Sequence, residues 1–122
     1  MELHTSGEDY LEAILVLRKT KNEVRSIDLA EHLGVSRPSV SRAVGLLKEG
    51  GFLKDGDGSL EFTQAGLETA KRIYERHCFF KKQLIQAGVD EKTAEEEACR
   101  MEHALSQDSF DKIRANIGKE PK

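Results

Sequence analysis

Residues 26–47 have the sequence SIDLAEHLGVSRPSVSRAVGLL, and this stretch decides the fold because its spacing fits two helices joined by a tight turn. Ala30 is small where the two helices would cross, and Gly34 permits the turn that follows. Val40 then falls where a side chain packs beneath the crossing. The pattern predicts a helix-turn-helix, whose second helix contacts DNA. The competing interpretation is a pair of helices that only pack around a small residue.

Polar and basic residues gather near the amino end of the second helix, where the side chains of a helix-turn-helix reach base edges or phosphates. The candidates are Ser36, Arg37, Pro38, Ser39, Ser41 and Arg42. Ser36 would cap this helix, and Pro38 suits its first turn. For Arg37 and Arg42, a solvated surface charge is the alternative.

A β-hairpin follows the helix-turn-helix in the sequence. Residues 52–54 and 60–62 predict two short strands, and the run DGDGS between them predicts a turn. A hairpin in this place makes a winged helix, and the agreement of the two features favours DNA binding over simple packing. Asp55 and Asp57 make the tip of the wing acidic. Contacts of the wing with phosphate would therefore come from Lys54, Ser59 and backbone amides.

Helical spacing of apolar residues continues on both sides of the winged helix. The expected helices are one that ends near Lys19, a long one from Thr63 to Ala87, one capped by Asp90, and one capped by Ser106 that runs through Ile117. Ser26 is expected to cap the first helix of the helix-turn-helix. The sequence predicts a mainly α protein, with a winged helix-turn-helix domain at 1–70 and an all-helical domain at 71–122.

Length and composition describe one small domain or two tightly joined subdomains, because the chain has 122 residues, of which 38% are hydrophobic and 34% charged. The first residues lack the basic and then apolar pattern of a secretory signal, and no apolar run approaches the roughly 20 residues that span a bilayer. We therefore expect a cytoplasmic protein without a membrane partner. Because a chain of this size buries a modest core, we also expect a dimer.

The net charge and the number of cysteines limit how the protein could bind nucleic acid and how its fold is stabilised. The formal net charge of -3 argues against binding of nucleic acid through bulk positive charge, so a DNA-binding role requires local basic side chains. Cys78 and Cys99 are too few for a disulfide framework. In a reducing compartment both are expected to be thiols or metal ligands.

Two sets of residues with oxygen, nitrogen or sulfur donors fall at helical spacings that could chelate a divalent ion, and one histidine between them could complete the ligand shell. They are Asp9 and Glu12 near the amino end, His77 in the long helix, and Cys99, Glu102 and His103 further on. Such a mixed set suits manganese or ferrous iron better than structural zinc, which takes several Cys and His ligands at short spacings. The alternative is that the carboxylates are solvated and Cys99 is a small buried apolar side chain.

Four segments together resemble the diphtheria toxin repressor and manganese transport regulator family. They are EDYLE at 8–12, VRSIDLAEHLGVSRPSVSRAV at 24–44, RH at 76–77 and EACRMEHALS at 97–106. The resemblance covers nearly the whole chain and points to the short, two-domain branch of the family. It implies a winged helix-turn-helix followed by a helical domain that binds metal and dimerises. The metal-loaded homodimer would bind a palindromic operator in double-stranded DNA and repress metal-uptake genes.

The resemblance also places all six donor residues on metal-ligand positions. The manganese branch has Asp at the position of Asp9 but Glu at that of Cys99, whereas the iron branch has Met and Cys at these positions. The implied cofactors are therefore Mn(II), Fe(II) or both, with one or two ions per protomer. An ancillary site of the iron branch would need ligands at Lys81 and Glu95, and a protonated Lys81 cannot be one. We expect that site to be altered or absent.

Two other functions compete with a metal-dependent repressor. A metal with carboxylate, His and Cys ligands could activate water in an enzyme. However, the chain has no Gly-rich phosphate loop or nucleophile motif, so we expect no enzyme and no small-molecule substrate. The other competitor is a winged-helix regulator that senses a signal other than metal.

Overall fold

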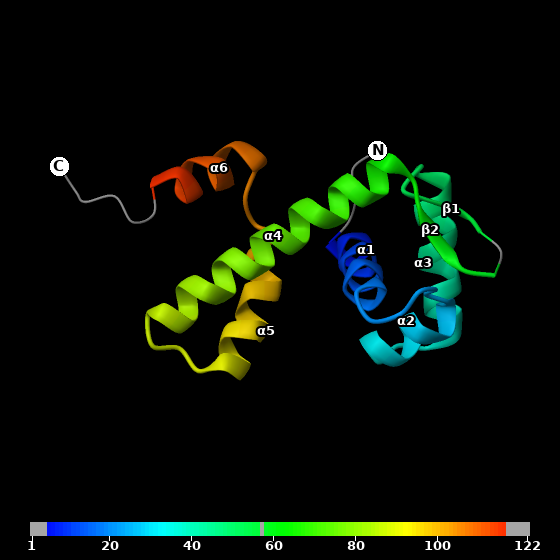
Figure 1. The fold of residues 1–122 in the computed structure, drawn as a ribbon, viewed down its shortest axis with the longest axis horizontal. Coiled ribbons are helices and arrows are strands. Elements are labelled where there is room, and N and C mark those ends of the chain that lie inside the picture. The colour runs from blue at the N-terminus through cyan, green and yellow to red at the C-terminus, as the bar shows by residue number, and fades with distance from the viewer. Residues whose placement is uncertain (1–4, 57, 117–122) are drawn as a thin grey trace. The chain divides into compact units, whose positions relative to one another are not determined.

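The computed structural model describes residues 5–56 and 58–116, and these form two compact units (Figure 1). The first unit ends at Arg72 and the second begins at Ile73. The boundary therefore falls within the helix α4 (Gln64–Gln86).

The first unit contains a helix-turn-helix with a wing. Its elements before α4 are α1 (Thr5–Arg18), α2 (Ser26–Leu33), α3 (Arg37–Glu49), β1 (Leu53–Asp55) and β2 (Leu60–Phe62). The two strands are antiparallel, with Leu53 opposite Phe62 and Asp55 opposite Leu60. The second unit contains the rest of α4 followed by α5 (Glu91–Met101) and α6 (Gln107–Asn116). The prediction of a mainly α fold, with a winged helix-turn-helix before a helical domain, is confirmed.

Capping side chains set several helix ends as the sequence predicts. Ser36 Oγ accepts from the backbone N–H of Ser39 at 3.3 Å, and Asp90 Oδ2 accepts from that of Thr93 at 3.0 Å. Ser106 Oγ accepts in the same way from Ser109 at 3.1 Å. The predicted turn is also present, because Gly34 ends α2 with a φ of 68°, in the left-handed region that glycine adopts without strain. The last helix is described to Asn116, so the Ile117 to which it was expected to run lies outside the described residues.

The predicted cap at Ser26 is wrong. Arg25 takes the cap position and Ser26 is the first helical residue. The reason is that Asp28 Oδ2, inside the first turn, accepts the Arg25 backbone N–H at 2.9 Å. This hydrogen bond, together with one from Lys21, lowers the pKa of the Asp28 carboxyl.

Several element boundaries differ from the prediction by one residue, including the ends of the first strand at Asp55 and of the long helix at Gln86. The first helix ends at Arg18 rather than near Lys19. The first strand starts at Leu53, because the backbone N–H of Phe52 donates back to Leu47 O at 2.9 Å, in the turn that follows α3. The long helix starts at Gln64, because Thr63 Oγ1 accepts the backbone N–H of Gly66 at 3.0 Å and acts as its cap.

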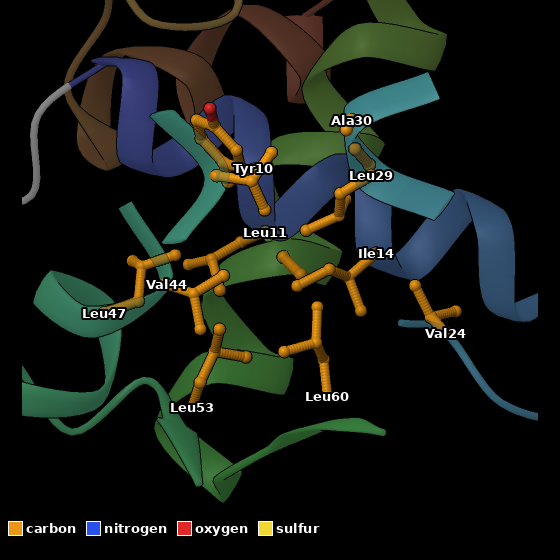
Figure 2. Packing of buried hydrophobic residues seen from close by; sticks show 13 residues of the cluster. Tyr10, Leu11, Ile14, Val24, Leu29, Ala30, Val44, Leu47, Leu53 and Leu60 are labelled. Atoms are coloured by element: carbon orange, nitrogen blue, oxygen red, sulfur yellow. The ribbon is translucent and has the colours of Figure 1, made fainter. Parts of the chain in front are cut away.

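The core of the first unit joins α1 to the helix-turn-helix and the wing (Figure 2). Leu11, Ile14, Leu29 and Val40 are each fully buried. The loop before α2 contributes Val24 to this core, and the two strands of the wing contribute Leu53 and Leu60. The wing is held to the segment before α2 by a hydrogen bond from Leu60 N to Val24 O at 2.8 Å. Any shift of α1 must therefore be accommodated by the side chains that support α3.

The second unit is held together by aromatic side chains. Phe79, Phe80 and Phe110 meet edge to face, with ring centroids 5.4–5.8 Å apart. The Arg76 guanidinium lies 5.3 Å from the centre of the Phe110 ring and donates to the carbonyl of Leu105 at 2.6 Å. Among the described residues, no helix has the length and apolar character that crossing a membrane requires.

Candidate metal centre and DNA-binding face

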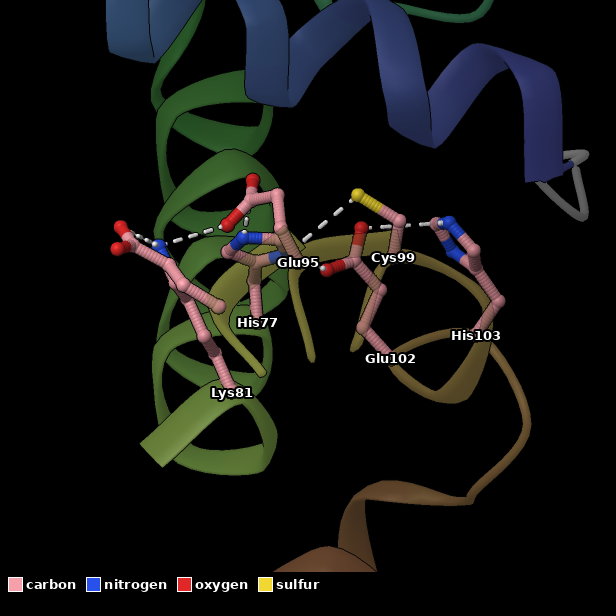
Figure 3. A network of polar contacts seen from close by, with 7 residues as sticks. His77, Lys81, Glu95, Cys99, Glu102 and His103 are labelled. Carbon is pink, nitrogen blue, oxygen red and sulfur yellow. Dashed lines mark hydrogen bonds and ion pairs between the residues drawn. The ribbon is translucent and has the colours of Figure 1, made fainter. Parts of the chain in front are cut away.

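His77 lies between two carboxylates in the second unit (Figure 3). Its Nδ1 is 2.9 Å from Glu102 Oε2, and its Nε2 is 2.9 Å from Glu95 Oε1. His77 comes from α4, whereas Glu95 lies on α5 and Glu102 directly follows that helix. Packing of α5 against α4 therefore places one acidic oxygen at each ring nitrogen.

The thiol of Cys99 lies next to His77 and Glu102, on the Nδ1 side of the ring. Cys99 Sγ is 3.6 Å from His77 Nδ1. Cys99 precedes Glu102 by three residues, so Cys99 in the last turn of α5 and Glu102 at the cap of that helix lie on the same side. One donor atom each from His77, Cys99 and Glu102 lies within 4.8 Å of the others. Three of the predicted ligands thus converge in space.

The donor set fits a divalent transition-metal ion. Glu102 is 1% exposed, and its Oε1 makes no hydrogen bond among the described residues, although His103 Nε2 lies 3.4 Å away. A buried carboxylate oxygen without a donor is costly and favours a cation as its partner. Carboxylate, imidazole and thiolate together suit Fe(II), Mn(II) or Zn(II) better than the hard ions Mg(II) and Ca(II).

The Nε2 side of His77 carries a different arrangement. Lys81 Nζ is 2.9 Å from Glu95 Oε2 and 3.8 Å from Glu91 Oε1. The hydrogen bond to Glu95 raises the pKa of the Lys81 ammonium. Desolvation alone would raise the pKa of Glu95, but its hydrogen bonds with Lys81 and His77 outweigh this effect and lower the pKa. Glu95 is therefore an anion held between an imidazole and an ammonium group.

Asp9 and Glu12 lie on α1 of the first unit, both half-buried and three residues apart on one face. The other four predicted ligands belong to the second unit. That all six bind the same ion or ions stays a prediction, which the resemblance of the sequence supports.

The predicted DNA-binding residues occupy the exposed side of α3. Arg37, Pro38, Ser41 and Arg42 are exposed, as is the capping residue Ser36, and Ser39 is half-buried. The opposite side of α3 is buried through Val40, Val44 and Leu47. In the wing, Lys54 is exposed and Ser59 half-buried. Asp55 of the wing pairs with Lys48, whereas Asp57 lies outside the described residues. The helix therefore presents two guanidinium groups and short hydroxyls to a ligand.

Through the resemblance, the sequence already indicated Lys81 and Glu95 as neighbours of His77 at the ancillary site of the iron branch, and in the structure Glu95 contacts both His77 and Lys81. The spacing agrees, since Glu95 precedes Cys99 by four residues and so falls on the same face of α5. The role of Arg76 was missed. Its guanidinium donates to the backbone carbonyl of Glu102 at 3.1 Å and so fixes the end of α5 that carries this ligand.

Two family models match the chain in succession. The iron dependent repressor N-terminal DNA binding domain matches residues 2–56, and the iron dependent repressor metal binding and dimerisation domain matches residues 63–121. The first model covers α3 with its exposed arginines, and the second covers His77, Cys99 and Glu102.

Individual relatives match most of the chain. An uncharacterized HTH-type transcriptional regulator of Methanocaldococcus jannaschii is 35% identical over 112 residues, which are 89% of this chain and 90% of that protein. The HTH-type transcriptional regulator MntR of Lysinibacillus sphaericus is 35% identical over 109 residues, 88% of this chain and 78% of that protein. A solved manganese-dependent transcriptional repressor in complex with manganese matches 93% of this chain with a TM-score of 0.82 and 28% identity. The chain spans about half the length of that solved protein, 53%.

Proposed function

Because the chain belongs to the diphtheria toxin repressor and manganese transport regulator family of iron-dependent repressors, we propose that it represses metal-uptake genes when Mn(II) or Fe(II) is bound. Membership of this family makes the chain a metal-dependent DNA-binding transcriptional repressor and not an enzyme.

The observation that carries the proposal is the convergence of His77, Cys99 and Glu102, whose donor atoms lie within 4.8 Å of one another. We assign these three residues and His103, whose Nε2 lies 3.4 Å from Glu102 Oε1, to the metal centre. Asp9 and Glu12 complete the proposed ligand set, by the resemblance of the segment EDYLE. A bound divalent ion supplies positive charge that offsets the carboxylates, and the protein holds one or two such ions per protomer.

Metal binding and DNA binding are linked through α1 in this proposal. Asp9 and Glu12 are carried by α1, which shares its core with α2 and α3 through Leu11 and Ile14. Ligation by these carboxylates would restrict the positions that α1 can adopt. Because α1 and α3 pack on common side chains, the same restriction would apply to the helix that carries Arg37 and Arg42.

Two copies of α3 are needed to read a specific DNA site, because one recognition helix covers only a few base pairs. The chain has a metal-binding and dimerisation domain, and a homodimer presents its two recognition helices with two-fold symmetry. We therefore propose a palindromic operator and place the repressor in the cytoplasm, where it meets that DNA.

The test is a metal titration of DNA binding under anaerobic, reducing conditions with Mn(II), Fe(II) and Zn(II) in parallel. The DNA is selected from a random-sequence pool by the metal-loaded protein, so the selection also reports whether the site is palindromic. We expect tight binding only with metal, and loss of this dependence in His103→Ala. Binding that is equal with and without metal would identify a regulator of another signal. Selection of a lone half-site by a single protomer would contradict the dimeric mode.

A further inference from the structure

The ring of His77 separates two clusters of opposite character (Figure 3). On the Nδ1 side lie Cys99 Sγ at 3.6 Å and Glu102 Oε2 at 2.9 Å, which are groups that donate electron pairs to a metal. On the Nε2 side lies Glu95, whose Oε1 faces the ring while its Oε2 already holds the Lys81 ammonium at 2.9 Å. The second side therefore contains a cation that is part of the chain.

We propose that Lys81 acts as a tethered cation that takes the place of a metal ion on the Nε2 side of His77 and so confines metal binding to the side of Cys99 and Glu102. This inference rests on the proposed function, because it concerns the capacity of the same metal centre.

The placement of Lys81 on two packed helices supports this role. His77 and Lys81 are one turn apart on α4, and Glu91 and Glu95 are one turn apart on α5. Lys81 Nζ lies 2.9 Å from the Glu95 carboxylate and 3.8 Å from the Glu91 carboxylate. An ammonium has three donors and no lone pair, so it offsets the charge of the carboxylates without offering a ligand to a metal.

Without the Lys81 ammonium, the residues on the Nε2 side of His77 would suit a small cation. The carboxylates of Glu91 and Glu95 together with His77 Nε2 supply oxygen and nitrogen donors of the kind that Mn(II) binds. A surface hollow lined by Lys81, Glu91, Lys92, Glu95 and Glu96 lies beside them, and the Glu95 side chain is 47% exposed. A hydrated ion can reach this place from solvent, so the charge and chemistry of residue 81 decide whether it stays.

The ion pair between Lys81 and Glu95 also determines which ring nitrogen of His77 carries the hydrogen. Glu95 is held as an anion at 2.9 Å from Nε2, so this nitrogen can donate a hydrogen bond to it. When Nε2 carries the hydrogen, the lone pair of the neutral ring is on Nδ1, which faces Cys99 and Glu102. Glu95 and Lys81 are thus positioning residues that direct His77 toward one side.

The test measures the number of Mn(II) ions retained per protomer at equilibrium, by electron paramagnetic resonance and elemental analysis of the full chain. Lys81→Glu exchanges the tethered cation for a third carboxylate, and we expect it to bind one more Mn(II) than the wild type. Lys82→Glu is the matched control, because it makes the same charge change at the exposed neighbouring position. The double variant Lys81→Glu/Glu95→Gln should lose the additional ion.

Lys81→Gln provides a second variant that adds no negative charge to the fold. It should show weak additional uptake of Mn(II) that disappears in Lys81→Gln/Glu95→Gln. Equal stoichiometry in the wild type and both Lys81 variants would overturn the tethered-cation role, as would equal gains in Lys81→Glu and Lys82→Glu. The wild type is measured in parallel, and its failure to bind any Mn(II), Fe(II) or Zn(II) would instead overturn the proposed function.

Discussion

Glu102 Oε2 lies 2.9 Å from His77 Nδ1, and the two residues are only 1% and 7% exposed. The contact joins the end of α5 to the middle of α4 across 25 positions of sequence. A carboxylate so deeply buried is unfavourable without a partner of opposite charge. The pair therefore links the packing of the second unit to the charge at the candidate metal centre.

Glu102→Gln should weaken Mn(II) and Fe(II) binding by roughly 10–100-fold or more, since the loss of supporting groups alone has effects of this size. The amide keeps the shape of the side chain but lacks its charge. Wild type at a metal concentration of about 100 times Kd should gain about 2.7 kcal/mol of stability, and the variant should lose most of this gain. Thermal unfolding with and without metal measures the difference.

Glu96→Gln is the control for this prediction, because Glu96 is an exposed residue on the same helix. Its metal-dependent stabilisation should equal that of the wild type. An equal loss in both variants would mean that general negative charge, and not the buried site, attracts the metal.

Cys99→Glu should shift metal preference toward Mn(II), and Cys99→Ala should weaken Fe(II) binding more than Mn(II) binding. The reason is that a thiolate prefers softer ions than a carboxylate does. We expect a change in the Fe(II) to Mn(II) preference on the order of tenfold, which is about 1.4 kcal/mol. Anaerobic metal titrations of the wild type and the two Cys99 variants measure this preference, and Cys78→Ala, at an exposed cysteine, is the control. The same preference in all of them would show that Cys99 packs without ligating or ligates through its backbone carbonyl.

Arg37→Ala and Arg42→Ala should each weaken operator binding while leaving metal affinity nearly unchanged. A lost base contact costs about 1–3 kcal/mol, and a lost phosphate contact lowers the salt dependence of binding by about one ion. Binding measured over a series of salt concentrations distinguishes the two kinds of contact. Arg18→Ala, at the exposed end of α1, makes the same substitution away from α3 and the wing and should have little effect. Unchanged affinity in both arginine variants would refute the placement of the recognition helix.

Gly66→Ala should destabilise the first unit by about 1–3 kcal/mol or more, because an added Cβ would lie 1.8 Å from Phe52 O. The backbone of α4 approaches the start of the wing too closely for any side chain. Gly45→Ala in α3 is the counterpart, since an added Cβ there meets nothing within 4 Å. It should stabilise the protein by about 1 kcal/mol through helix propensity. Chemical denaturation of both variants tests the opposite signs.

Much of the local structure of both units follows from the sequence alone. The turn at Gly34, the caps at Ser36 and Asp90 and the apolar spacing of the helices depend on residues a few positions apart, so a linear pattern contains them. The cap at Ser26 was predicted wrongly because Asp28, three residues beyond Arg25, supplied a competing acceptor. The family of the protein could also be identified from sequence, because its motifs are short contiguous segments.

The metal centre could be predicted only in part from the sequence. The sequence indicates that Cys99 and Glu102 share a face of one helix and offers His77 as a further donor, and the resemblance places all three on metal-ligand positions. The contacts of His77 with Cys99, Glu102 and Glu95 join residues 18 to 25 positions apart. Which nitrogen faces the thiol and which faces the lysine-bound carboxylate depends on how α4 and α5 pack. Periodicity within each helix contains no information about that packing, so only the tertiary structure decided it.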